Sequence, residues 1–450
     1  MADCLERIAA AGLVGMGGAG FPTHVKLNGD IRHIIVNGME CEPLLGTDRY
    51  AMRHMADALV AALVTICREL SIEQATFCLK KTYVDEIAAL RAAIGRAGAD
   101  ISIHTTESFY PAGDEQVVVY EVTGRTVPPL NIPLSVGCAV LNVGTLLAAY
   151  DALEGKPLTH RLLTVAGEVA APCILRVPIG TPYADCIAAA GGMTREDVCI
   201  VSGGPMMGKR HAADALASLY VQKTTNGILV LPTARYRGAS ADMREIRARA
   251  RAACIQCSYC TDLCPRHLLG HPLEPHRIMR KLAYEPLSNV LGDPVVQSAA
   301  LCSECGVCEV YACPMGLQPR SVNALIKKEL REAGIRYPKS EESTPPHPMR
   351  ENRLAPTKRI AARAGVLPYY GAPSDTMREV APRRVLLALS QGAGAPSEPV
   401  VAAGERVGAG QRVAACREGA LGAHLHAPVA GVVRRVDAQY IEIEREDVEG

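Results

Sequence analysis

Residues 254–265 read CIQCSYCTDLCP, and residues 302–314 read CSECGVCEVYACP. The spacing C-x2-C-x2-C-x3-C-P is that of cysteines that ligate a 4Fe–4S cluster. The first run follows it with Cys254, Cys257, Cys260 and Cys264. The second run has one extra residue before its last cysteine and carries Cys302, Cys305, Cys308 and Cys313. The two runs therefore predict two iron–sulfur clusters and single-electron transfer.

The order of the cysteines also predicts which thiols share a cluster. In proteins with two such runs, the fourth cysteine of each run ligates the other cluster. One set is then Cys254, Cys257, Cys260 and Cys313, and the other is Cys302, Cys305, Cys308 and Cys264. The alternative is two zinc sites with four cysteines each, although zinc sites more often use pairs of cysteines separated by a longer gap.

Length and composition limit the classes of protein to which this chain can belong. A length of 450 residues suits about three domains of ~150 residues each, and the net charge of +1 gives no case for nucleic acid or an anionic membrane surface. The first residues lack the basic and apolar regions of a secretory signal. The longest apolar run, residues 58–67, has about half of the ~20 residues that a membrane span needs. We therefore expect a cytoplasmic protein without a membrane span, whose 17 cysteines are thiols.

Residues 1–155 alternate between strand and helix patterns. Strands are expected at 33–41, 77–83 and 101–108, and helices at 48–70 and 84–98. This alternation is typical of a mostly parallel sheet covered by helices.

A glycine-rich stretch, GMGGAGFPTHVKL, occupies residues 15–27. It formally contains G-x-G-x-x-G, but the dinucleotide-binding form of that motif must follow a strand, and the preceding residues are helical in pattern. Two interpretations remain open. The stretch is either a flexible structural turn or a phosphate cradle to which Lys26 adds a positive charge.

Two further loops carry polar residues. VNGMECEP (36–43) places Asn37, Glu40 and Glu42 just after a strand, where ligands of open α/β sheets bind. FYPAGDEQ (109–116) joins aromatic residues to a Pro-Ala-Gly turn and two carboxylates. Taken singly, a loop of either kind is more often a solvated turn than a binding site.

These stretches, together with VLNVGTL (140–146), resemble in order the flavin-binding motifs of the NADH-oxidising flavoprotein subunit of complex I. They are more similar still to the C subunit of the Rnf electron-transport complex. The resemblance implies noncovalent FMN with NADH as the electron donor. On the phosphate side it implies Gly15, Gly17, Gly18 and Lys26. Along the flavin and nicotinamide it implies Asn37, Glu40, Tyr110, Gly113, Asp114, Asn142 and Thr145.

The remaining chain completes a multidomain α/β protein. Residues 156–238 resemble a soluble-ligand-binding β-grasp domain, with a spacer as the alternative, and their turn GGPMMG (203–208) is interpreted as loop packing. Residues 239–336 form the α-helical, ferredoxin-like unit with two clusters, and 337–382 a Pro-rich linker. Residues 383–450 resemble a barrel-sandwich hybrid β domain. No lysine follows Lys358, so that domain is not a lipoyl or biotin carrier.

Domain order separates two families. In the Rnf subunit the barrel-sandwich domain precedes the flavin motifs, whereas here it follows the clusters. This order is similar to that of the cobalamin reductases of propanediol utilisation, over nearly the whole chain. The resemblance implies reduction of cob(III)alamin to cob(I)alamin, an adenosyltransferase partner and a bacterial microcompartment. Two alternatives stay open: an electron-input subunit of an Rnf-like membrane complex, and a non-catalytic module with a dead flavin site.

Overall fold

The first unit is a parallel sheet whose strands are apolar on both faces, as strands covered by helices on both sides require. The computed structural model describes residues 2–234, 236, 243–371 and 375–446. The strand order is β3-β2-β1-β5, and every pair is parallel. The strands are β1 (His33–Asn37), β2 (Gln74–Lys80), β3 (Ser102–Thr106) and β5 (Cys138–Asn142).

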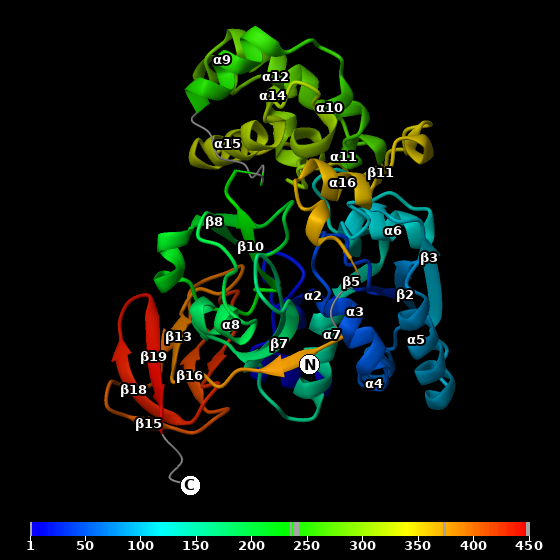
Figure 1. Ribbon diagram of the computed structural model, residues 1–450. Coiled ribbons are helices and arrows are strands. Elements are labelled where there is room, and N and C mark those ends of the chain that lie inside the picture. Colours follow the sequence, from blue (N-terminus) through cyan, green and yellow to red (C-terminus); the bar gives the residue numbers. More distant parts are fainter. Residues whose placement is uncertain (1, 235, 237–242, 372–374, 447–450) are drawn as a thin grey trace.

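Helices cover both faces of this sheet (Figure 1). Ile34 and Leu141 face the helices α1, α4 and α7, whereas Ile35 and Val140 face α6. The helices of this unit are α1 (Asp3–Ala10), α2 (Thr23–Lys26), α3 (Thr47–His54), α4 (Ala56–Glu69), α5 (Val84–Ala97), α6 (Glu115–Thr123) and α7 (Val143–Leu153). The helix expected at 48–70 is thus two helices, α3 and α4, which meet at 88°.

This bend bears on the question of a membrane span. Among the described residues, no single helix has both the length and the apolar composition to cross a membrane. The pair α3 and α4 meets those criteria only when the two are joined across their bend.

The second unit is a mixed sheet of six strands in the order β12-β7-β6-β10-β8-β9, with the helix α8 (Tyr183–Ala189) packed against it. Its strands β6 and β7 form an antiparallel hairpin, and the helix α8 follows it. The strands are β6 (His160–Gly167), β7 (Cys173–Pro178), β8 (Val198–Ser202), β9 (Lys209–Ala212), β10 (Gly227–Pro232) and β12 (Met377–Glu379).

The cysteine runs lie in a helical unit with its own apolar core, at the top of Figure 1. Its helices are α9 (Met243–Ala253), α10 (Tyr259–Asp262), α11 (Pro265–Leu268), α12 (Pro275–Tyr284), α13 (Leu287–Val290), α14 (Pro294–Gln297) and α15 (Pro319–Glu332). A π-helical turn, η4 (Val307–Ala312), contains Cys308. Short 3-10 turns elsewhere are η1 (Pro133–Val136), η2 (Ala213–Ser218), η3 (Ser298–Leu301), η5 (Arg350–Asn352) and η6 (Leu367–Tyr369).

The segment expected as a linker, 337–382, carries secondary structure of its own. Its strand β11 (Ala355–Pro356) pairs with β4 (Phe109–Tyr110) of the first unit, and its strand β12 pairs with β7 of the second. Between these strands lies the helix α16 (Thr357–Arg363). The segment therefore joins two units by backbone hydrogen bonds.

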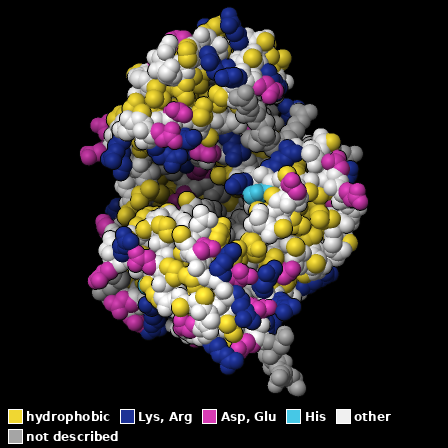
Figure 2. Space-filling model, turned by 90° about the vertical axis from the view of Figure 1, so that its left-hand side faces the viewer, with side chains coloured by type: hydrophobic (Ala, Val, Ile, Leu, Met, Phe, Trp, Pro, Cys, Tyr) yellow, Lys and Arg dark blue, Asp and Glu magenta, His cyan; other side chains and the backbone are white. Residues whose placement is uncertain are grey.

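The last unit consists of two antiparallel sheets, ordered β13-β19-β18-β15 and β14-β16-β17. Its apolar side chains, such as Val385, belong to one cluster with Leu13 and Met16 of the first unit. On the face drawn in Figure 2 the molecule is hollowed between its upper and lower parts. The strands are β13 (Arg384–Ala388), β14 (Glu398–Pro399), β15 (Arg406–Val407), β16 (Arg412–Ala415), β17 (Leu425–His426), β18 (Gly431–Val436) and β19 (Tyr440–Arg445).

Candidate redox site

A pocket lies between the glycine-rich loop and the carboxyl ends of β1 and β5. Eight of the eleven residues expected at the flavin line it: Gly15, Gly17, Gly18, Lys26, Asn37, Gly113, Asn142 and Thr145. A Cβ at Gly17 would stand 2.9 Å from the Cβ of Asn142, whereas a Cβ at Gly18 would meet nothing within 4 Å. The loop thus packs closely against Asn142 and leaves open space beside Gly18.

The pocket ends at the first turn of α7. Asn142 caps this helix, since its Oδ1 accepts hydrogen bonds from the backbone N–H of Gly144 (2.9 Å) and of Thr145 (3.4 Å). The hydroxyl of Thr145 accepts one from the N–H of Met16 (2.9 Å), which ties the glycine-rich loop to the helix. Asn37 donates to the carbonyl of Gly113 (2.9 Å) on the opposite side of the pocket. Helix N-termini and exposed loop amides favour anions.

The charge of Lys26 and the exposure of Phe21 at this pocket suit a flavin that carries a phosphate. Lys26 and Glu115 both line the pocket, and Lys26 Nζ forms an ion pair with Glu115 Oε1 at 2.5 Å. The positive charge of the lysine is therefore at the pocket and is held there by the carboxylate. The aromatic ring of Phe21 lines the pocket and is 39% exposed. The glycine backbone, the helix N-terminus and Lys26 together fit the phosphate side of FMN. The contacts of individual residues with FMN stay predictions.

Three of the expected flavin residues make other contacts. Glu40 lines a different cavity, and its Oε2 accepts from the backbone N–H of Asp48 (2.5 Å). Asp114 caps α6 and forms an ion pair with Arg266 at 2.9 Å. The buried Tyr110 points toward the cysteine unit, as described below.

The turn GGPMMG does more than pack as a loop. The backbone N–H groups of Met206 and Met207 each donate to the carboxylate of Glu42 at 2.9 Å. Arg320 of the cysteine unit donates to the carbonyl of Met206 at 2.8 Å. Burial raises the pKa of Glu42 to about 7 despite these bonds. The donors are backbone groups, so the side-chain pattern could not have revealed this junction of three units.

The structure groups the eight thiols in the exchanged order. Cys254, Cys257, Cys260 and Cys313 line one small pocket, whose other walls include Met279 and Leu317. In the second set, Cys308 has the thiols of Cys302, Cys305 and Cys264 as neighbours. Burial raises the pKa of Cys308 well above its ordinary value, and the negative charge of these thiols raises it further. No three Cys, His, Asp or Glu side chains of the described residues converge on a position for a single ion.

The two runs also share an unusual backbone. The residues just before and after the second cysteine of each run are left-handed: Gln256 and Ser258 (φ 56° and 61°), and Glu304 and Gly306 (φ 58° and 81°). Such turns direct successive N–H groups toward one centre. The N–H of Glu304 lies 3.3 Å from the sulfur of Cys302, and amide bonds to sulfur are one means of tuning a cluster. Donor set and backbone therefore fit two 4Fe–4S clusters.

One set lies against the flavin domain and the other faces outward. The hydroxyl of Tyr110 donates to the carbonyl of Cys305 at 2.7 Å and lies 3.2 Å from Glu42 Oε1. Cys264, Cys305 and Cys308 are buried, whereas Cys254, Cys257 and Cys260 are partly exposed. We call the first the inner set (with Cys302) and the second the outer set (with Cys313).

Four family models match successive parts of the chain. Residues 8–151 match the Nuo51 FMN-binding domain and 162–209 the SLBB domain. Residues 253–318 match a 4Fe-4S dicluster domain, and 371–448 match the RnfC barrel sandwich hybrid domain. These matches confirm the predicted fold class and the predicted complement of FMN and two 4Fe–4S clusters.

Curated relatives match over different lengths. The protein from Salmonella typhimurium named "Cobalamin reductase PduS" is 40% identical over 98% of this chain and 96% of its own length. The protein of the same name from Citrobacter freundii gives the same figures. The C subunit of the proton-translocating ferredoxin:NAD(+) oxidoreductase complex of Clostridium ljungdahlii is 36% identical over 59% of this chain and 56% of its own. The resemblance inferred from domain order is confirmed, and the chain belongs to the PduS family of cobalamin reductases.

Proposed function

We propose that this protein is an NADH-dependent reductase that passes single electrons to the cobalt of cobalamin, from cob(III)alamin to cob(I)alamin. The observation that carries the proposal is the match over 98% of the chain to a cobalamin reductase. The relatives that are subunits of ion-translocating complexes match only about three fifths of the chain.

The chemistry divides between cofactors and chain. Bound FMN accepts a hydride from NADH and releases electrons singly, and each cluster carries one electron at a time. The glycine-rich loop, Lys26 and the first turn of α7 would hold the phosphate of the flavin, since they line one pocket. Phe21 lines the same pocket and is partly exposed, so its ring would be available to stack against a planar ligand. Tyr110 fixes the inner cysteine set against the flavin domain.

The chemistry of the product bears on the partner enzyme and on the location of the protein in the cell. Cob(I)alamin is a strong nucleophile and is readily oxidised, so a reductase that makes it works best beside the enzyme that consumes it. We therefore propose an adenosyltransferase as the partner, and a bacterial microcompartment in the cytoplasm as the location. The full-length relatives named PduS support this proposal.

Anaerobic purification followed by cofactor analysis tests the proposal. The expected result is about eight irons and one flavin per chain, and reduction of cob(III)alamin by NADH that is visible in the cobalamin spectrum. Fewer than about eight irons would exclude two complete 4Fe–4S clusters.

The same experiment separates the alternatives. Bleaching of the clusters by NADH without any cobalt reduction would indicate a relay to another acceptor, as in an Rnf-like complex. Protein that binds no FMN would indicate a non-catalytic module.

A further inference from the structure

Three large apolar side chains are exposed to solvent around the outer set of cysteines. Ile255 is 62% exposed, Tyr259 54% and Met315 41%. Each lies within two positions of an outer cysteine in the chain, and Ile255 and Met315 also line the pocket that these cysteines share. Exposed apolar side chains are ordinarily scattered singly over a surface, so three around one centre indicate a contact surface. We call these three residues the apolar rim.

The two helices next to the apolar rim are strongly basic. Helix α9 leads directly into Cys254, and Met279 of α12 lines the outer pocket. The two helices are joined by Arg247, whose Nε donates to the carbonyl of Leu282 at 2.9 Å. Together they carry seven basic residues and a single acidic one, Glu245, whereas the whole chain has a net charge of only +1. The basic residues are Arg244, Arg247, Arg249, Arg251, Arg277, Arg280 and Lys281.

Three of these arginines are exposed and have no carboxylate at ion-pair distance in the described part of the chain. They are Arg249, Arg251 and Arg280. Arg249 lies beside the apolar rim, because its Nη2 donates to the carbonyl of Gly316, the residue after Met315, at 3.2 Å. Their positive charge is therefore available to a partner.

The charge of the clusters does not account for these arginines. A 4Fe–4S cluster with four thiolate ligands is anionic, and buried cations near it would offset that charge. Arg251 and Arg280 are exposed instead, so water and salt screen their effect on the cluster. Their position suits a partner outside the molecule, since α9 and α12 lie at the end opposite to the barrel-sandwich domain (Figure 1).

We propose that the apolar rim and the arginines around it form the docking surface for an acidic protein that accepts single electrons from the outer cluster. The arginines attract the acidic partner and orient it, and the apolar rim excludes water where the redox centres approach. A contact of this size suits a transient redox encounter, which buries less than about 1,200 Å². Each transfer oxidises the cluster by one electron and reduces the partner by one, and no bond forms or breaks. The direction of transfer rests on the proposed function, in which electrons enter through the flavin.

Two haem proteins of opposite charge serve as probes of this surface. Cytochrome b5 is acidic, cytochrome c is basic, and each accepts one electron. The full chain, loaded with FMN and iron, is reduced with dithionite, freed of excess reductant and mixed with either cytochrome in a stopped-flow instrument. Binding of cytochrome b5 to the oxidised protein is measured separately by surface plasmon resonance. Neither measurement involves NADH or cobalamin.

The double variant Arg249→Glu/Arg251→Glu should lose the preference for the acidic probe. At low ionic strength we expect at least tenfold slower reduction of cytochrome b5 and at least tenfold weaker binding, whereas reduction of cytochrome c should not slow. Salt at about 1 M, where the Debye length is only ~3 Å, should abolish the difference from the parent. Arg251→Glu alone, expected to slow cytochrome b5 at least threefold, keeps the test valid if the double variant loses iron.

Lys328→Glu/Arg331→Glu is the matched control, with the same change of charge in the same unit. Both residues are exposed on α15, beside Lys327, which donates to the carbonyl of Cys302 of the inner set at 3.1 Å. This variant should bind and reduce cytochrome b5 as the parent does.

The proposal is overturned if the α9 double variant slows cytochrome b5 no more than the α15 variant does, or slows cytochrome c to the same extent. It is also overturned if the parent but not the α9 variant binds vesicles of phosphatidylserine while both reduce cytochrome b5 equally, because the arginines would then serve a membrane surface. None of these outcomes touches the proposed function. Failure of NADH to reduce the clusters would count against the proposed function alone.

Discussion

At the scale of single residues, Lys223 stands out because it is 1% exposed and joins three units. Its Nζ donates to the carbonyls of Gly12 (2.7 Å) and His424 (2.6 Å), and its backbone N–H donates to Gln391 Oε1 (2.9 Å). Burial lowers the pKa of Lys223 to about 7. This residue of the β-grasp domain therefore fixes the flavin domain to the barrel-sandwich domain at an electrostatic cost.

The first prediction is that Lys223 makes stability rise with pH. Between pH 7 and about 10 the unfolded chain keeps the lysine proton that the folded chain has released, so the free energy of unfolding increases by up to about 1.4 kcal/mol per pH unit. Below pH 7 both states are protonated and the contribution is constant. Lys223→Met should flatten this rise, as measured by thermal unfolding at pH 7, 8 and 9. Lys358→Met, exposed on α16, is the control. An unchanged slope in Lys223→Met would contradict the prediction.

At the scale of elements, the loop after β13 packs directly against the glycine-rich loop. The N–H of Ala393 donates to the carbonyl of Gly20 at 3.1 Å. A Cβ at Gly392 would lie 2.4 Å from that same carbonyl oxygen, and Gly20 itself is left-handed, with φ of 70°. Glycine is thus required on both sides of the contact. The barrel-sandwich domain therefore sets the position of the loop that lines the flavin pocket.

The second prediction follows from this contact. Gly392→Val should displace the glycine-rich loop and weaken FMN binding at least tenfold, as measured by flavin fluorescence on titration of the flavin-free protein. Iron content should stay the same, because the cysteine unit has a separate core. Gly408→Val in the same domain meets nothing within 4 Å and should bind FMN as the parent does. Equal FMN affinities of the two variants would refute the role of the contact.

The third prediction concerns the exchange of cysteines between the two runs. Cys264 is the last cysteine of the first run but neighbours Cys302, Cys305 and Cys308 of the second. Cys264→Ala should therefore damage the cluster of the inner set and spare that of the outer set. Electron paramagnetic resonance of the reduced protein distinguishes the two clusters, with Cys313→Ala as the reciprocal variant. Loss of only the outer cluster in Cys264→Ala would show that the ligands are not exchanged.

At the scale of the whole molecule, the flavin domain, the inner set and the outer set follow one another in space. The flavin domain contacts the inner set through Tyr110, while the outer set lies on the partly exposed side of the cysteine unit. The ion pair of Asp114 with Arg266 holds the same interface. We expect electrons to enter at the inner set and to leave from the outer set.

The fourth prediction tests this direction. In Cys257→Ala, which lacks an intact outer cluster, NADH should still reduce the inner cluster. In Cys305→Ala, NADH should fail to reduce the outer cluster, although dithionite still reduces it. Freeze-quench paramagnetic resonance reports both signals. The reverse pattern, with NADH reducing the outer cluster in Cys305→Ala, would mean that electrons enter from the other side.

Much of the fold and part of the site could be predicted from local patterns. The alternation of strand and helix in residues 1–155, the spacing of the eight cysteines and the four flavin motifs each lie within short stretches of chain. Eight of the eleven expected flavin residues consequently line one pocket. The break between α3 and α4 was missed because Met55, where it occurs, is not a helix-breaking residue.

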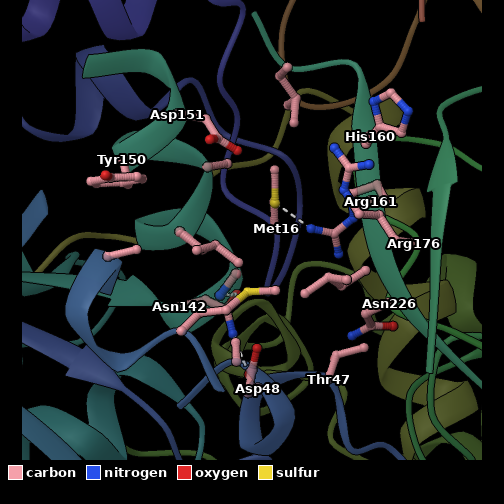
Figure 3. A pocket seen from close by; sticks show the side chains of 18 of the residues that line it. Met16, Thr47, Asp48, Asn142, Tyr150, Asp151, His160, Arg161, Arg176 and Asn226 are labelled. Carbon is pink, nitrogen blue, oxygen red and sulfur yellow. Dashed lines mark hydrogen bonds between the residues drawn. The ribbon is translucent and has the colours of Figure 1, made fainter. Parts of the chain in front are cut away.

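By itself, then, the sequence determined that this protein carries flavin and iron–sulfur chemistry, because ligand spacing is a local property of the chain. Only the tertiary structure decided how the units meet. Glu42 with Met206, Gly20 with Gly392 and Tyr110 with Cys305 are contacts between residues more than 160 positions apart. Several of the groups involved are backbone N–H and C=O, which every residue possesses and which leave no pattern in the sequence. The cavity that Glu40 lines (Figure 3) exists for the same reason, since its walls come from two different units of the chain.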